Sequence, residues 1–171
     1  STQSLKTSAL DIRVNTRTGQ IKFYTSDGTQ LLNEKASGTV LTACQDGPYA
    51  SYKVSSQFTL TSTEQIYGLG LLQNNRFNQR DATYSNMIEG NMSVWIPYFY
   101  STKGYSIFWN NASPTSYSES SNTLKMESAV GYGVDYFFMV GSGEQSVANM
   151  RQLTGQVPMI PLWAYGYFQS K

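Results

Sequence analysis

The sequence predicts a mostly β fold: an antiparallel β-sandwich with one short helix near the C-terminus. Its 171 residues are enough for one domain with a hydrophobic core and too few for two ordinary domains. Aromatic residues make up 14% of the chain and charged residues only 13%, against about 25% charged in an average soluble domain. Apolar and polar residues alternate over several short stretches between turn-forming residues, as in strands with one buried face.

The first strands carry the clearest pattern. Leu10, Ile12 and Val14 alternate with polar residues, which predicts a half-buried strand. A Ser-Asp-Gly turn stands at 26–28, between two further short apolar stretches. The pattern therefore predicts a ladder of hairpins over residues 9–35.

Six further strands are predicted along the rest of the chain. They lie at residues 40–43, 50–60, 93–100, 105–109, 123–127 and 134–140. The segment at 65–70 brings Gly68 and Gly70 close together, which marks a β-bulge or a close approach of two backbones.

Residues 71–92 break the strand pattern, because they show no clean period and are rich in Asn and Gln. A long irregular segment inside a compact domain is usually either functional or disordered. Phe77 and Tyr84 indicate that this one is packed. We interpret it as an ordered loop.

The period changes from two to that of a helix near the C-terminus. Ser142 and Gln145 form a capping box, and Gly155 followed by Pro158 marks a helix end. Three apolar residues fall on one helical face: Val147, Met150 and Leu153. These signals predict a helix over residues 143–154.

Residues 160–168 are almost wholly apolar. A continuous apolar run is typical of a strand buried on both faces, as in a parallel sheet, and nothing follows in the sequence to bury it. We therefore expect the chain to stop just after the first strand of another domain. The alternative is a last strand of the same sandwich.

The composition excludes several classes of function. The chain has no His, which removes the usual general base, the Ser-His and Cys-His nucleophile pairs and most zinc sites. Cys44 is the single cysteine, so neither an internal disulfide nor a CxxC motif can form. The net charge of +1 gives no basic excess for nucleic acid, and no apolar run reaches the roughly 18 residues of a membrane span. The N-terminus lacks Met, which indicates a processed or trimmed chain, and we favour a periplasmic or secreted location over a cytoplasmic one.

Four motifs stand in order in the second half of the chain. They are YGLG at 67–70, IPYFY at 96–100 with GYSIFWNN at 104–111, DYFF at 135–138 with LTG at 153–155, and PLWAYGYFQS at 161–170. In this order and spacing they resemble glycoside hydrolase family 31, whose members include α-glucosidases and α-xylosidases. Residues 1–64 match the family only in general strand pattern. The sequence departs from the family pattern at residues 71–72 and at Asn110.

The resemblance implies a division of the chain and a role. Residues 1–155 would form the family's N-terminal β-sandwich, of the galactose mutarotase-like type, and residues 156–171 would open a (β/α)8 catalytic barrel. The family's members are retaining enzymes that hydrolyse α-linked oligosaccharides with two Asp residues of the barrel, which would lie beyond Lys171. The implied partners are an oligosaccharide substrate and the chain's own barrel, with no metal or organic cofactor.

The acidic residues of this chain agree with the expectation that the catalytic residues lie beyond Lys171. A retaining mechanism needs two carboxyls about 5–5.5 Å apart. Asp81 and Glu89 are the nearest pair in the irregular segment, eight residues apart and with no reason to converge. We expect no catalytic residue here and no hydrolysis by this chain alone.

The resemblance also implies candidate substrate contacts. In the family a loop of the sandwich, here 71–92, reaches the sugar site, and Arg80 with Asp81 resembles an Arg-Asp pair that some members aim at the sugar; the alternative is a surface ion pair. Asn91 stands where related α-xylosidases carry a polar residue, and an ordinary turn residue is the alternative. Trp163 would lie near the floor of the site or serve packing alone.

A function of a different class is a free-standing carbohydrate-binding β-sandwich with no enzyme attached. A complete binding module should end in polar residues after its last strand. The apolar run at 160–168 favours the domain of a glycosidase instead.

Overall fold

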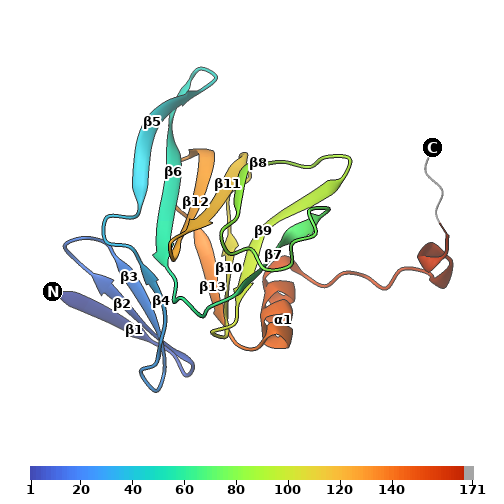
Figure 1. The fold of residues 1–171 in the computed structure, drawn as a ribbon. Helices are drawn as coiled ribbons and strands as arrows, with labels where there is room; N and C mark the ends of the chain where they lie inside the picture. The colour runs from blue at the N-terminus through green and yellow to red at the C-terminus, as the bar shows by residue number, and fades with distance from the viewer. Residues whose placement is uncertain (168–171) are drawn as a thin grey trace.

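The computed structural model describes residues 1–167, which form thirteen strands, one α-helix and one 3₁₀ helix (Figure 1). The strands are β1 (Thr2–Lys6), β2 (Leu10–Asn15), β3 (Ile21–Thr25), β4 (Gln30–Glu34), β5 (Val40–Asp46), β6 (Tyr49–Thr59), β7 (Ile66–Leu72), β8 (Thr83–Met87), β9 (Ser93–Ser101), β10 (Tyr105–Trp109), β11 (Thr115–Ser120), β12 (Thr123–Gly131) and β13 (Tyr136–Val140). The helices are α1 (Gly143–Thr154) and the 3₁₀ helix η1 (Leu162–Tyr165).

Within residues 1–167 the strands form two antiparallel sheets. The larger has nine strands in the order β1-β2-β3-β4-β6-β12-β11-β8, with β5 joined to β6. The smaller has four strands in the order β13-β10-β9-β7. The predicted mostly β, antiparallel sandwich with one helix near the C-terminus is confirmed.

The hydrophobic core lies between the two sheets. The small sheet contributes Phe99, Tyr105 and Trp109, which are fully buried, and the large sheet contributes Phe58 and Leu124. Large aromatic side chains dominate this core because each buries more apolar surface than an aliphatic one. The aromatic content of the sequence is therefore explained first by packing.

The alternating segments formed the predicted strands. The ladder over residues 9–35 is confirmed as β2, β3 and β4, which pair in sequence. The predicted bulge at Gly68 and Gly70 is confirmed too, because the register between β7 and β9 shifts there. The strands β1, β8 and β11 were not predicted. β1 and β11 show no clear sequence pattern. β8 lies inside the segment 71–92, so the interpretation of that segment as irregular throughout is wrong.

Helix α1 has the predicted bounds, and its capping box is present. The Ser142 hydroxyl accepts from the Gln145 amide, and the Gln145 side chain accepts from the Ser142 amide. The helix packs beside β13. The apolar face is not fully buried, however, because Val147 is 57% exposed and Leu153 is 40% exposed.

The strand predicted over residues 160–168 is not formed by its described part. Residues 162–165 form η1 instead, and this segment projects away from the sandwich (Figure 1). A strand needs a neighbour for its backbone hydrogen bonds, and no strand of residues 1–167 pairs with this segment. Residues 168–171, which complete the predicted strand and the second predicted domain, lie outside the described residues.

Candidate functional site

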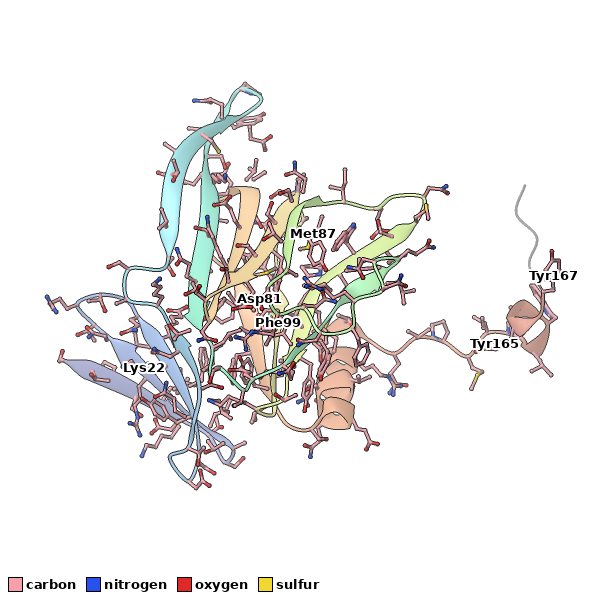
Figure 2. All side chains as sticks on the ribbon, viewed as in Figure 1. Lys22, Asp81, Met87, Phe99, Tyr165 and Tyr167 are labelled. Atoms are coloured by element: carbon pink, nitrogen blue, oxygen red, sulfur yellow. The ribbon has the colours of Figure 1, made fainter. Side chains whose placement is uncertain are left out.

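The segment 71–92, which the sequence singled out, has two halves of different structure. Residues 73–82 run irregularly from β7 to β8, and β8 then pairs with β11 of the large sheet. A tight turn leads into β9, where Gly90 and Ser93 bridge each other's backbone. The segment thus connects the two sheets, and Figure 2 labels Asp81 before β8 and Met87 at its end.

Arg80 is held on the inside of this segment. Its Nε donates to Glu119 Oε2 at 3.0 Å and its Nη2 to Asn122 Oδ1 at 2.6 Å. Its Nη1 donates to the backbone oxygens of Thr61, at 2.9 Å, and Glu64. Its side chain is only 13% exposed and that of Glu119 is fully buried. Arg80 therefore ties the segment to the β11–β12 hairpin and to the turn before β7.

Asp81 lies beside Arg80 without pairing with it. Its amide donates to the same Glu119 Oε2 at 2.7 Å, and its carbonyl accepts from Arg76 Nη1 at 3.0 Å. Its φ of 54° turns the chain sharply. Its exposed carboxylate makes no hydrogen bond or ion pair within residues 1–167. The expected side-chain contact from Arg80 to Asp81 is thus replaced by a shared bond to Glu119.

Asn91 and Trp163 lie elsewhere. Asn91 is exposed at the tip of the turn between β8 and β9. Trp163 belongs to η1 and is 76% exposed, and Figure 1 places η1 far from both sheets. Within the described part of the chain, no hydrogen bond joins either residue to Arg80 or Asp81. The structure brings Arg80 and Asp81 together and leaves the other two apart.

A buried carboxylate that the sequence did not single out supports this region. Glu64 is 2% exposed. It accepts from the Ser101 and Tyr105 hydroxyls with one oxygen and from the Thr61 amide, at 2.9 Å, with the other. Burial raises the pKa of the Tyr105 phenol well above its ordinary value, and the Glu64 charge adds to that rise. Tyr105 therefore stays protonated and acts as a donor. No local sequence pattern could have revealed partners 37 and 41 residues away.

A pocket opens at the end of the sandwich where this segment enters β9. It has a volume of about 350 Å³. Its walls come from the end of β8, the start of β9 and the loop between β10 and β11, through Met87, Glu89, Trp95, Pro97, Asn111 and Pro114. Trp95 is half-buried, and its ring lies 5.2 Å from that of Tyr84. An apolar wall and polar groups therefore meet in one concave site.

The outer faces of the two sheets differ in polarity. Residues directly opposite on paired strands share a face of the sheet. Phe99 is buried in the core, so Tyr98 and Tyr100, before and after it on β9, lie on the outer face. The outer face of the small sheet carries nine apolar or aromatic residues and one polar residue, Ser106, which is fully buried. The nine are Tyr67, Leu71, Val94, Ile96, Tyr98, Tyr100, Phe108, Phe137 and Met139. The middle of the large sheet carries on its outer face Ser55, Gln57, Ser116, Ser118, Lys125 and Glu127. We call the first of these the apolar outer face; Leu71 there is 74% exposed and Ile96 44%.

Neither a metal centre nor a membrane helix is found in the described chain. No group of three or more acidic or cysteine side chains in residues 1–167 could hold a metal ion. Among the same residues, no helix is long and apolar enough to cross a membrane.

Comparison with known proteins gives consistent matches. Residues 1–117 match the family described as the glycosyl hydrolase 31 N-terminal galactose mutarotase-like domain. An alpha-xylosidase of Saccharolobus solfataricus is 30% identical over 165 residues, which are 88% of this chain and 23% of the relative. A family 31 dextranase of Flavobacterium johnsoniae, solved with glucose, is 29% identical with a TM-score of 0.79 over 98% of this chain and 21% of that one.

A third match concerns the fold alone. A family 31 alpha-xylosidase from a soil metagenome, solved with xylose, has a TM-score of 0.81 at 22% identity and covers 96% of this chain and 28% of that one. This chain spans less than a third of each of these three proteins. With a family match over more than half of its residues, the chain belongs to the N-terminal galactose mutarotase-like domains of glycoside hydrolase family 31.

Proposed function

We propose that this chain is the non-catalytic N-terminal domain of a retaining α-glycosidase, acting on α-linked xylosides or glucosides. Residues 1–155 would be the sandwich and residues 156–171 the start of a (β/α)8 catalytic barrel. The sandwich would support the barrel and lend the segment 71–92 to the sugar site. The substrate class rests on the alpha-xylosidase and the dextranase to which the chain is similar.

The apolar outer face is the observation that carries the supporting role. An antiparallel sheet with one solvated face normally alternates apolar and polar residues, as the large sheet does here. The small sheet is apolar on both faces, and exposed apolar patches of this kind mark interaction sites. Phe108 and Phe137 stack across this face with centroids 6.2 Å apart. A second protein layer, such as the barrel, would bury it.

The carboxylates support the absence of catalysis. Eight of the eleven accept a hydrogen bond within the domain: Asp11, Asp27, Glu34, Glu64, Glu89, Glu119, Glu127 and Asp135. The three others, Asp46, Asp81 and Glu144, lie on β5, in the 73–82 connection and on α1. Free carboxylates on three separate elements do not suit a mechanism that needs two of them about 5–5.5 Å apart.

Each candidate substrate residue takes a different part in this proposal. Asp81 keeps a free, exposed carboxylate that could accept sugar hydroxyls. Arg80 would act as a positioning residue, because its guanidinium is already bound to Glu119. Asn91 and Trp163 would reach the sugar only with the barrel in place, from the tip of the β8–β9 turn and from η1.

The test is one substitution measured in two proteins, this chain and the longer gene product. In the chain alone, Ile96→Lys should lower self-association and the binding of an apolar dye, because it adds a charge to an exposed apolar face. In the longer protein the same charge would be buried against the barrel, so the melting temperature and the hydrolysis of p-nitrophenyl α-xyloside or α-glucoside should fall. Thr59→Lys, at an exposed position on the outer face of the large sheet opposite Thr123 and Asn33, is the matched control and should change neither protein.

The outcomes separate the proposal from its alternative. A longer protein that cleaves one substrate, with a silent 171-residue chain, supports the proposal and names the sugar. A longer protein that tolerates Ile96→Lys as well as Thr59→Lys contradicts a supporting role of this face. The alternative, a free-standing carbohydrate-binding module, is favoured by one observation, the pocket beside Trp95. Tolerance of the outer-face substitution would favour this alternative.

A further inference from the structure

We propose that the pocket between Trp95, Glu89 and Asn111 is a sugar subsite of this domain, and that it takes a neutral pyranoside ring. This inference rests on the proposed carbohydrate function and names the part of the chain that touches the sugar. The pocket has a volume of about 350 Å³. This lies at the small end of the roughly 300–1,000 Å³ that ligand pockets span, and such a volume fits a short saccharide.

The polar groups of the pocket are in place and partly free. Glu89 Oε1 accepts from the Trp95 amide at 3.1 Å, which orients the carboxylate, and Oε2 has no partner in the described chain. The indole N–H of Trp95 likewise meets no acceptor within residues 1–167. The pocket thus offers one charged acceptor and one donor, which adjacent sugar hydroxyls can use at the same time.

The apolar wall of the pocket suits the C–H face of a sugar ring. The Trp95 ring lies with Met87, Pro97 and Pro114 around the pocket, and an aromatic ring with a polar N–H can take both the C–H face and a hydroxyl of a pyranose. Because no Lys or Arg lines the pocket and Glu89 carries a negative charge, an anionic ligand is disfavoured.

The far wall is rigid before any ligand binds. Asn111 Nδ2 donates to the Val130 carbonyl at 2.9 Å, and its Oδ1 accepts from the Ser113 amide at 2.8 Å. The Ser113 hydroxyl reaches the same Val130 oxygen at 2.9 Å. A Cβ on Gly131 would approach Asn111 Nδ2 to 2.9 Å, so a glycine leaves room for this arrangement. Rigid walls lower the entropy lost on binding.

The same geometry explains why Arg80 does not serve as the sugar contact. The Arg80 guanidinium is bound to Glu119 and is not free to meet a ligand, whereas the residues from Ile88 onward are exposed beside the pocket. The second half of the segment is therefore the part that lines the pocket.

The experiment is a titration of the 171-residue chain with isomaltose and with methyl α-xyloside, followed by amide and indole NMR signals. We expect saturable shifts at Trp95, Glu89 and Asn111. Glu89→Gln keeps an oxygen for the Trp95 amide and removes the charged acceptor, so the affinity should fall about tenfold or more. Trp95→Phe keeps an aromatic wall without the indole donor and should weaken binding by a smaller factor.

Two controls make the result decisive. Asp46→Asn makes the same carboxylate-to-amide change near the tip of the β5–β6 hairpin and should leave the affinity unchanged. Sorbitol, an acyclic polyol, should bind more weakly than either glycoside. The inference is overturned by shifts that do not saturate, by equal affinities of Glu89→Gln and the parent chain, or by equal binding of sorbitol. Because the outer-face test with Ile96→Lys includes self-association and the melting temperature, which are measured without sugar, the failure of one proposal is distinguishable from the failure of the other.

Discussion

Arg80 shows at the scale of one residue how a candidate substrate contact becomes part of the scaffold. A buried Arg–Glu pair is of little net benefit over apolar residues, but removal of one partner leaves an uncompensated buried charge. Glu119 is fully buried, and one of its oxygens already lacks a partner in the described structure. The pair therefore sets the path of the segment 71–92, and its loss is expected to be a stability effect first.

We predict that Arg80→Met lowers the free energy of unfolding by about 3–5 kcal/mol, because buried Glu119 would lose its Arg80 ion-pair partner. Urea unfolding of the isolated chain measures this. Arg76→Met is the control, since exposed Arg76 makes a single bond to the Asp81 carbonyl and should lose about 1 kcal/mol or less. Similar losses from both variants would refute the anchoring role of Arg80.

A second buried carboxylate makes stability depend on pH. Burial raises the pKa of Glu34, and hydrogen bonds from the Tyr136 hydroxyl, at 2.6 Å, and the Ile21 amide, at 2.9 Å, offset part of that rise. Since the folded pKa is the higher one, the stabilisation from this group is complete below the ordinary value of 4.5. It is lost as the pH rises through the raised value.

Tyr136→Phe should raise the pKa of Glu34 further, because the charged carboxylate loses a donor. The variant should therefore lose more stability than the parent between pH 4 and pH 7. Unfolding free energies at both values, with carboxyl NMR titration of Glu34, measure the two effects. Tyr132→Phe, at a side chain that is 78% exposed, should behave as the parent does, and an identical pH dependence of the Tyr136 variant would refute the coupling.

At the scale of elements, the YGLG segment shows why β7 needs glycine. Gly68, Leu69 and Gly70 all have positive φ, of 120°, 67° and 104°, a region that residues with a Cβ adopt at a cost. A Cβ on Gly70 would stand 1.9 Å from the Val94 carbonyl oxygen. The bulge thus lets β7 approach β9 closely.

Gly70→Ala should accordingly lower the free energy of unfolding by about 2 kcal/mol or more, through the strain of a positive φ and the clash with Val94. Gly133→Ala is a close control, because a Cβ there meets nothing within 4 Å and its φ is not positive. Thermal unfolding of the two variants checks this. A Gly70 variant as stable as the Gly133 variant would show that β9 can shift freely.

Strands were predictable where one face is apolar, and not where polar residues point inward. Apolar and polar residues alternate in β2 and at the start of β3, and this pattern predicted both strands. β11 was not predicted because its buried positions include the polar residues Thr115 and Glu119. Polar residues of this kind normally face solvent, and the burial of Glu119 is explained only by its ion pair with Arg80. The site was less predictable still, since the partners of Arg80 and Glu64 come from strands and turns distant in the sequence.

At the scale of the whole molecule, the described chain leaves two apolar regions uncovered. One is the exposed part of the apolar outer face, at Leu71, Val94 and Ile96. The other is the segment after α1, where Val157, Met159 and Leu162 are each more than four-fifths exposed. In water, exposed surface of this size favours association. Strands β7 and β9, which carry that part of the face, lie on the side of the molecule toward which the C-terminal segment runs (Figure 1).

Removal of residues 157–171 should therefore reduce self-association of the isolated chain without loss of the sandwich. The hydrogen bonds found for residues 157–167, such as that from the Tyr165 hydroxyl to Met159, stay within that segment, so the melting temperature should stay within a few degrees. Sedimentation velocity of the trimmed and intact chains measures the association. If trimming leaves the association unchanged while Ile96→Lys abolishes it, the apolar outer face alone drives the contact, and the terminal segment is passive. If trimming lowers the melting temperature, the segment stabilises the sandwich through contacts that its exposure argues against.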